Sequence, residues 1–107
     1  MYANKLQAIF LGTAEELYES LPDDEVVDIT GAVEFLKIGD FESVETKTLK
    51  GSINELKVRR YRFLFCVEDS IIYFLRGFIK KNLKTPRNEI EMAEKVHTTI
   101  INHLKLS

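Results

Sequence analysis

The middle of this sequence is rich in lysine and arginine, whose positive side chains are suited to binding phosphate groups. Residues 50–87 contain ten lysines and arginines and only three acids. Arginine grips a phosphate through two parallel hydrogen bonds, and lysine adds a compact positive charge. These residue types favour a site for a nucleic-acid backbone, and a solvated charged face is the alternative that composition alone leaves open. The ten cations are Lys50, Lys57, Arg59, Arg60, Arg62, Arg76, Lys80, Lys81, Lys84 and Arg87.

The alternation of side chains along two predicted strands brings some of these cations together. Arg60, just before the strand predicted at 61–68, and Arg62, within it, share one face, and the opposite face of that strand is aromatic. Within residues 71–80, one face is predicted to carry Phe74, Arg76, Phe78 and Lys80. Phe78 would stack on an unpaired base if it is exposed, and it would fill the core if it is not.

Other kinds of site are not favoured by the remaining reactive residues. Cys66 is the single cysteine and lies in an apolar run, so we predict a buried, unreactive thiol in a reducing compartment. His97 and His103 are six residues apart on a predicted helix, about 240° around its axis, and cannot share a metal ion as an i, i+4 pair could. The sequence therefore predicts no metal site and no cofactor.

The two halves of the chain carry opposite charge. Residues 1–47 hold three lysines against eleven acids, a net charge of −8, whereas residues 48–107 hold twelve cations against six acids, a net charge of +6. Such asymmetry predicts one surface that meets an anionic partner and another that meets solvent or a basic partner. No signal peptide or long apolar run is visible, so we expect a cytoplasmic protein.

The elements that position the cations can be read from periodicity. The 107 residues, 45% of them hydrophobic, predict one α+β domain spanning residues 1–107. We expect a strand at 5–11, a helix at 14–21 opened by a capping box of Thr13 and Glu16, and a second helix from Asp23 or Asp24 to Gly39. Residues 40–50 are predicted to be a connector.

The second half predicts strands at 53–59, 61–68 and 71–80, the last two paired as a hairpin. A closing amphipathic helix follows, with Thr85 as its cap and Pro86 in its first turn. The expected order is β-α-α-β-β-β-α.

Several motifs in this order resemble the RelE/HigB superfamily of toxins from type II toxin–antitoxin systems, closest to its phage-derived HigB-like branch. The resemblance covers about residues 47–95 and is carried by Leu49–Val58, Tyr61–Phe65, Leu75–Lys81, Lys84–Pro86 and Glu89–Ile90 with Ala93. It implies a RelE-like, microbial-ribonuclease-like fold with a small antiparallel sheet, an N-terminal helical hairpin and a C-terminal helix.

The resemblance also implies a function and roles for the cations. It implies a metal-independent endoribonuclease that cuts mRNA on the ribosome, inhibits translation and is neutralised by a helix-turn-helix antitoxin. Arg62 matches the arginine of the family's strand motif and is expected to stabilise the transition state, assisted by Lys57 or Arg59. One of Lys80, Lys81 and Lys84 would transfer a proton, since neighbouring cations disfavour the charged ammonium. The expected RNA contacts are Lys50, Arg60, Arg76, Phe78, Lys84 and Arg87.

Two departures from the family pattern keep alternatives open. The basic segment contains no histidine, and no tyrosine follows Tyr73, so the general acid and base are not identified. The chain also has a net charge of −2, whereas toxins of this family are often basic. A catalytically silent module that binds RNA or ribosomes would keep the same basic face. A phage accessory domain that binds an acidic protein is the other alternative.

Overall fold

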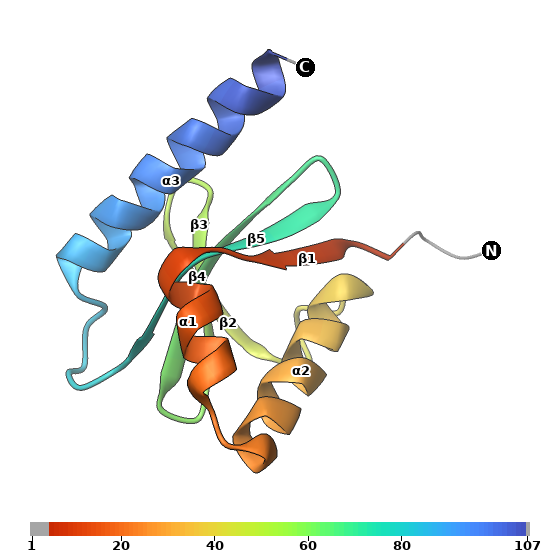
Figure 1. The fold of residues 1–107 in the computed structure, drawn as a ribbon, viewed down its shortest axis with the longest axis vertical. Coiled ribbons are helices and arrows are strands. Elements are labelled where there is room, and N and C mark those ends of the chain that lie inside the picture. The colour runs from red at the N-terminus through yellow and green to blue at the C-terminus, as the bar shows by residue number, and fades with distance from the viewer. Residues whose placement is uncertain (1–4, 107) are drawn as a thin grey trace.

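A five-stranded sheet, with helices on both faces, organises residues 5–106, which are the residues that the computed structural model describes (Figure 1). The strand order across the sheet is β1-β5-β4-β3-β2. Along the chain the elements are β1 (Gln7–Phe10), α1 (Gly12–Ser20), α2 (Asp23–Lys37), β2 (Glu45–Lys50), β3 (Ile53–Val58), β4 (Tyr61–Glu68), β5 (Ile71–Ile79) and α3 (Arg87–Lys105).

The predicted α+β class and the order of the predicted elements are confirmed, with one strand added. The end of the predicted connector is wrong, because residues 45–50 form β2 at the sheet edge, antiparallel to β3. The segment ETKTLK is too polar to indicate a strand from its sequence, and pairing with β3 stabilises the strand instead. The sheet is also mixed, because β1 runs parallel to β5.

Two hydrophobic cores lie on opposite faces of the sheet. The larger core packs α1 and α2 against the aromatic side of β4 and β5, around Phe63, Phe65 and Phe74. The smaller core packs α3 against Leu64, Cys66 and neighbouring apolar side chains. Figure 1 shows α3 running diagonally, apart from α1 and α2. The middle of β4 is thus buried on both sides, which explains its nearly continuous apolar sequence.

Helix α1 is held by backbone proximity to β5. The predicted capping box is wrong, because α1 has no side-chain cap and the Thr13 hydroxyl instead accepts a hydrogen bond from the Gly77 amide at 3.1 Å. A Cβ atom at Gly77 would lie 2.9 Å from the Cα of Ala14. Glycine is therefore required at Gly77 for the helix to approach the strand this closely.

A bulge in β5 changes which side chains share a face. Leu64 pairs with Arg76 and Phe65 pairs with Phe74, which leaves Leu75 as an extra residue in β5. The prediction that Phe74 lies beside Arg76 is therefore wrong: Phe74 is fully buried in the larger core. Beyond the bulge, Arg76 and Phe78 lie on the face of the sheet that carries α3. There they are the cross-strand neighbours of Leu64 and Arg62, respectively.

The predicted hairpin of the strands at 61–68 and 71–80 is confirmed. Asp69 and Ser70 have φ angles of 53° and 64°, as a two-residue hairpin turn of the type I′ class requires. At the opposite end of β4, Arg59 has a φ of 56° in the tight turn that follows β3. Among the described residues, no helix is both long and apolar enough to cross a membrane.

Candidate active site

The candidate site lies on the face of the sheet that carries α3, at the end that the helix leaves open. Three charged residues on neighbouring strands lie side by side in this region, because Glu45 pairs with Lys57 and Lys57 pairs with Arg62. Directly paired residues project from the same face of a sheet. The row therefore gathers charge from β2, β3 and β4 in one place.

Two adjoining hollows mark this region, and we call them together the basic cleft. The first has a volume of about 200 Å³ and contains Arg62 and Glu55 in its lining. The second, of about 760 Å³, shares Lys57, Arg62 and Lys80 with the first and extends toward residues 81–83. The cations that line the cleft are Lys47, Lys57, Arg59, Arg60, Arg62, Lys80 and Lys81. All five predicted catalytic residues are thus brought together.

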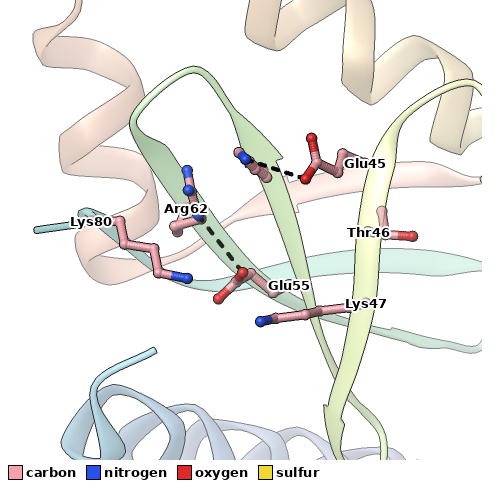
Figure 2. Close-up of a pocket in the computed structure, with 7 residues that line it drawn as sticks. Glu45, Thr46, Lys47, Glu55, Arg62 and Lys80 are labelled. Atoms are coloured by element: carbon pink, nitrogen blue, oxygen red, sulfur yellow. Dashed lines mark ion pairs between the residues drawn. The ribbon is translucent and has the colours of Figure 1, made fainter. Parts of the chain in front are cut away.

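Arg62 and Glu55 form the charged centre of the cleft. Both side chains are almost fully buried, at 9% and 4% exposure, and the Arg62 Nε lies 3.7 Å from Glu55 Oε2 (Figure 2). The Arg62 Nη1 donates to the carbonyl oxygens of Arg59 at 2.9 Å and Tyr61 at 3.0 Å. Glu55 also accepts a hydrogen bond from the Thr85 hydroxyl. These contacts fix the guanidinium in one orientation.

One polar atom at this centre is not satisfied by the protein. The Nε of Arg62 is buried and has no hydrogen-bond partner among the described residues. Buried polar atoms in folded proteins are nearly always hydrogen-bonded, and exceptions gather at functional sites. An anion that enters the cleft would meet a guanidinium that is already oriented and has hydrogen-bonding capacity left.

Lysines approach this centre from two sides. Figure 2 shows Lys80, from the end of β5, extending toward Glu55 and Arg62, and Lys47 reaching across from β2. Lys47 is the cross-strand neighbour of Glu55. Lys57 forms an ion pair with Glu45 at 3.3 Å. The cleft therefore retains more positive than negative charge around a buried carboxylate.

Arg59 and Arg60 lie at the rim, where they face the acidic start of α2. The Arg59 guanidinium contacts three acids, with its Nε 2.7 Å from Asp28 Oδ2, its Nη1 3.4 Å from Glu25 and 3.8 Å from Asp24. The hydrogen bond that the Arg59 Nε donates to the Asp28 carboxylate raises the pKa of Arg59. Because these acids compensate its charge, Arg59 is placed to orient the turn rather than to reach the cleft floor.

Arg60 stacks over a neighbouring aromatic ring. Its guanidinium lies 5.3 Å from the ring centre of Tyr61 and donates to the Tyr61 hydroxyl at 3.2 Å, which raises the pKa of Arg60. The Tyr61 hydroxyl in turn donates to Glu25. The acids in the first turn of α2, where the helix dipole favours negative charge, thus also hold the β3–β4 turn.

The six predicted RNA contacts do not lie together. Arg60 lines the basic cleft, whereas Lys50, Arg76 and Arg87 form ion pairs with the α3 acids Glu94, Glu89 and Glu91 at 3.2, 2.7 and 3.3 Å. Phe78 is half-buried and packs against the core beneath α3. Lys84 is exposed in the loop before α3. Their contact with RNA stays a prediction.

Lys47 and Glu55 are among the residues of the cleft that reasoning from sequence missed. Lys47 lies in the segment predicted as a connector, so no strand was there to place it. Glu55 is the one acid between Lys50 and Arg62, and it occupies a position that is 3% exposed. A single acid within a run of cations was the signal for it, because buried carboxylates in proteins are almost always paired.

Most of the chain matches a single known family. Residues 16–97 match the family described as phage derived protein Gp49-like (DUF891). No curated protein matches the sequence.

Solved structures with a similar fold come from toxin–antitoxin complexes. A chain of the RelBE2 complex from Mycobacterium tuberculosis is 18% identical, with a TM-score of 0.52 over 71% of this chain and 99% of that chain. A chain of the archaeal RelE–RelB complex from Pyrococcus horikoshii is 17% identical, with a TM-score of 0.56 over 70% of this chain and 94% of that chain. The predicted RelE-like fold is confirmed, and the chain belongs to the Gp49-like family of phage derived proteins.

Proposed function

We propose that this protein is the toxin of a type II toxin–antitoxin system and cuts mRNA on the ribosome. The observation that carries the proposal is the basic cleft, in which an oriented, buried Arg62 faces Glu55 among lysines. The RelE-like fold and the family membership support it. Residues 1–107 would act as one toxin domain. Because its substrate would be mRNA under translation, we expect the protein to act in the cytoplasm.

RNA cleavage without a metal ion has three requirements that a cleft of this kind can meet. The 2′-hydroxyl oxygen attacks the adjacent phosphorus and loses its proton to a base, a pentacovalent dianionic phosphorane is stabilised by positive charge, and the bond to the 5′-oxygen breaks as that oxygen gains a proton. The products are a 2′,3′-cyclic phosphate and a 5′-hydroxyl. No atom is supplied by water in this step.

We assign these roles from the geometry of the cleft. Arg62 stabilises the phosphorane, because its orientation is fixed before RNA binds. Glu55 is the carboxylate beside it and accepts the proton of the 2′-hydroxyl. Lys80 approaches the same centre and donates the proton to the leaving oxygen. Lys57 and Lys81 hold the flanking phosphates, with Lys47 on the opposite wall.

The partners of the protein follow from the same proposal. We propose that mRNA and ribosomal RNA bind the basic cleft and its rim through backbone phosphates. A small helix-turn-helix antitoxin would neutralise the toxin, which is supported by the similar structures having been solved as toxin–antitoxin complexes. Co-expression of a small reading frame adjacent to the gene would restore growth if it encodes that antitoxin.

The proposal is tested by induced expression in a bacterium, with growth curves and primer extension on abundant transcripts. The native chain should stop growth and create new mRNA 5′ ends, and Arg62→Ala should abolish both. Lys5→Ala is the control, because it also removes one positive charge, from a side chain that is 67% exposed and lies outside the cleft and outside the predicted RNA contacts. Circular dichroism of the purified variants shows that they are folded. Arrest and cleavage by folded Arg62→Ala would remove Arg62 from the mechanism.

A second candidate function, RNA or ribosome binding without cleavage, is favoured by one observation. Arg62 is paired with Glu55, and Arg59 contacts three acids, so two cations of the cleft are partly compensated. The same experiment separates the two functions. Intact transcripts in the presence of native protein that still binds RNA would support the silent module.

A further inference from the structure

Three metal-ligating side chains gather outside the basic cleft, where α3 crosses the far end of β4. They are Cys66 and Glu68 of β4 and His97 of α3, and one ligand atom from each lies within 4.8 Å of the others. Cys66 and Glu68 are two residues apart on a strand, so both project toward α3. The cluster joins segments that are about thirty residues apart in sequence, which is why no sequence motif announces it.

We propose that Cys66, Glu68 and His97 form a binding site for a divalent zinc-type cation. The three donors are a sulfur, a carboxylate oxygen and an imidazole nitrogen, a set that suits zinc among the common metals of proteins. Metal–ligand bonds of about 2.0–2.3 Å place tetrahedral ligand atoms roughly 3.5 Å apart. No two of the three atoms therefore need to approach by much more than an ångström, and the Glu68 Oε2 and His97 Nε2, now 2.8 Å apart, need to separate slightly; side-chain rotation can provide both shifts.

The surroundings of the cluster allow a metal ion to enter and leave room for a further ligand. Cys66 is fully buried and forms the inner wall, whereas Glu68 and His97 are 25% and 21% exposed. Glu68 also lines an open hollow of about 600 Å³ together with Asp69 and Ile101. Three protein ligands with one open, solvent-facing position is a common arrangement for zinc.

The contacts now present would be exchanged when the metal binds. The His97 Nε2 lies 2.8 Å from Glu68 Oε2, so a hydrogen bond already orients both groups toward each other. Metal binding would replace this bond, and the Cys66 thiol would release its proton to solvent. The bound ion would tie α3 to the sheet and stabilise the folded chain, because the three ligands come together only when it is folded.

The test uses the purified full-length chain with ZnCl₂ and, as a spectroscopic probe, CoCl₂. We expect one Zn²⁺ per chain, an increase in Tm with zinc concentration, and a sulfur-to-metal charge-transfer band with Co²⁺. His97→Gln should weaken zinc binding at least on the order of a hundredfold, since losing even a neighbour of a ligand lowers affinity about 10–100-fold. His103→Gln, on the same helix but outside the cluster, should bind zinc as the native chain does.

His97→Gln is the decisive variant, because glutamine can keep a hydrogen bond to Glu68, whereas replacement of the fully buried Cys66 also disturbs the core. Absence of the charge-transfer band in the native chain would overturn the proposal. Equal zinc affinity in folded His97→Gln and His103→Gln would overturn it as well. Neither result depends on RNA cleavage, so the metal site and the proposed function are tested separately.

Discussion

The buried pair of Glu55 and Arg62 should make a large, measurable contribution to stability. At 3.7 Å and an effective dielectric constant of about 20, the attraction between the two charges is about 4 kcal/mol before desolvation is subtracted. Glu55→Gln leaves the guanidinium charge without its partner, although Arg62 keeps two carbonyl acceptors. We therefore expect a loss of about 3 kcal/mol, at the lower end for a broken buried pair.

A double-mutant cycle separates this coupling from other effects of each substitution. Glu55→Gln and Arg62→Met are made singly and together, and the free energy of unfolding is measured by urea titration. We expect a coupling energy of about 2 kcal/mol, and a Tm about 15 °C lower for Glu55→Gln alone. The control is the exposed pair of Arg87 and Glu91, for which about 0.4 kcal/mol is expected.

The reasoning would be refuted if both pairs gave the same coupling energy. In that event solvent would screen Glu55 and Arg62 as fully as it screens a helix surface. A fixed, dehydrated guanidinium could then no longer be assumed in the cleft. The cycle also shows how much of any loss of activity in Glu55→Gln comes from unfolding.

Further predictions concern packing, the buried thiol and RNA contact. Gly77→Ala should destabilise the fold by about 2 kcal/mol, because the added Cβ would meet the backbone of α1. Gly31→Ala, which has open space around it, should stabilise α2 by about 0.8 kcal/mol. Urea titration of both variants measures these changes in the free energy of unfolding, and changes of the same sign would contradict the prediction. Burial raises the pKa of the Cys66 thiol to about 12, so iodoacetamide at pH 8 should react with Cys66 only after unfolding. The stability that the folded thiol contributes should be lost as pH rises from about 9 toward 12. Equal alkylation rates with and without urea would count against burial of the thiol. Lys80→Ala should weaken single-stranded RNA binding and reduce by about 0.7 the slope of log affinity against log salt concentration. Lys50→Ala should change this slope little, because Lys50 is paired with Glu94. A larger effect of Lys50→Ala than of Lys80→Ala would indicate that RNA runs closer to α3.

The fold could be predicted where local patterns agreed with tertiary packing. The apolar run of β4, the turn at Glu68-Asp69-Ser70 and the amphipathic closing helix each carry a strong local signal, and each is found where it was expected. The predicted Thr85 cap of the closing helix is wrong, because Pro86 is the N-cap and the Thr85 hydroxyl donates to Glu55 instead. β2 has no such signal, because an edge strand exposed to solvent can be polar and depends on its neighbour for hydrogen bonds. The β5 bulge is likewise set by pairing with β4, so strict alternation misplaced Phe74.

The candidate site was predictable in most of its cations, Lys47 excepted, and not in its acids. Residues of like charge close together in sequence pointed to Arg62, Lys57 and Lys80, and the sheet register brings them into one cleft. The partners of these cations come from distant segments. Asp28 of α2 contacts Arg59, and the acids of α3 pair with the predicted RNA contacts. Pairing of this kind depends on tertiary structure, which no spacing in the sequence encodes.

The central claim is tested most directly by the ends of the cleaved RNA. Purified protein is incubated with ribosomes carrying a 5′-labelled mRNA, either unmodified or with a single 2′-deoxynucleotide at the mapped cleavage position. We predict products with a 2′,3′-cyclic phosphate and a 5′-hydroxyl, no cleavage at the 2′-deoxynucleotide, and loss of cleavage in folded Arg62→Ala. Products with 5′-phosphate ends, or cleavage that persists at the 2′-deoxynucleotide, would contradict attack by the neighbouring 2′-hydroxyl in the basic cleft.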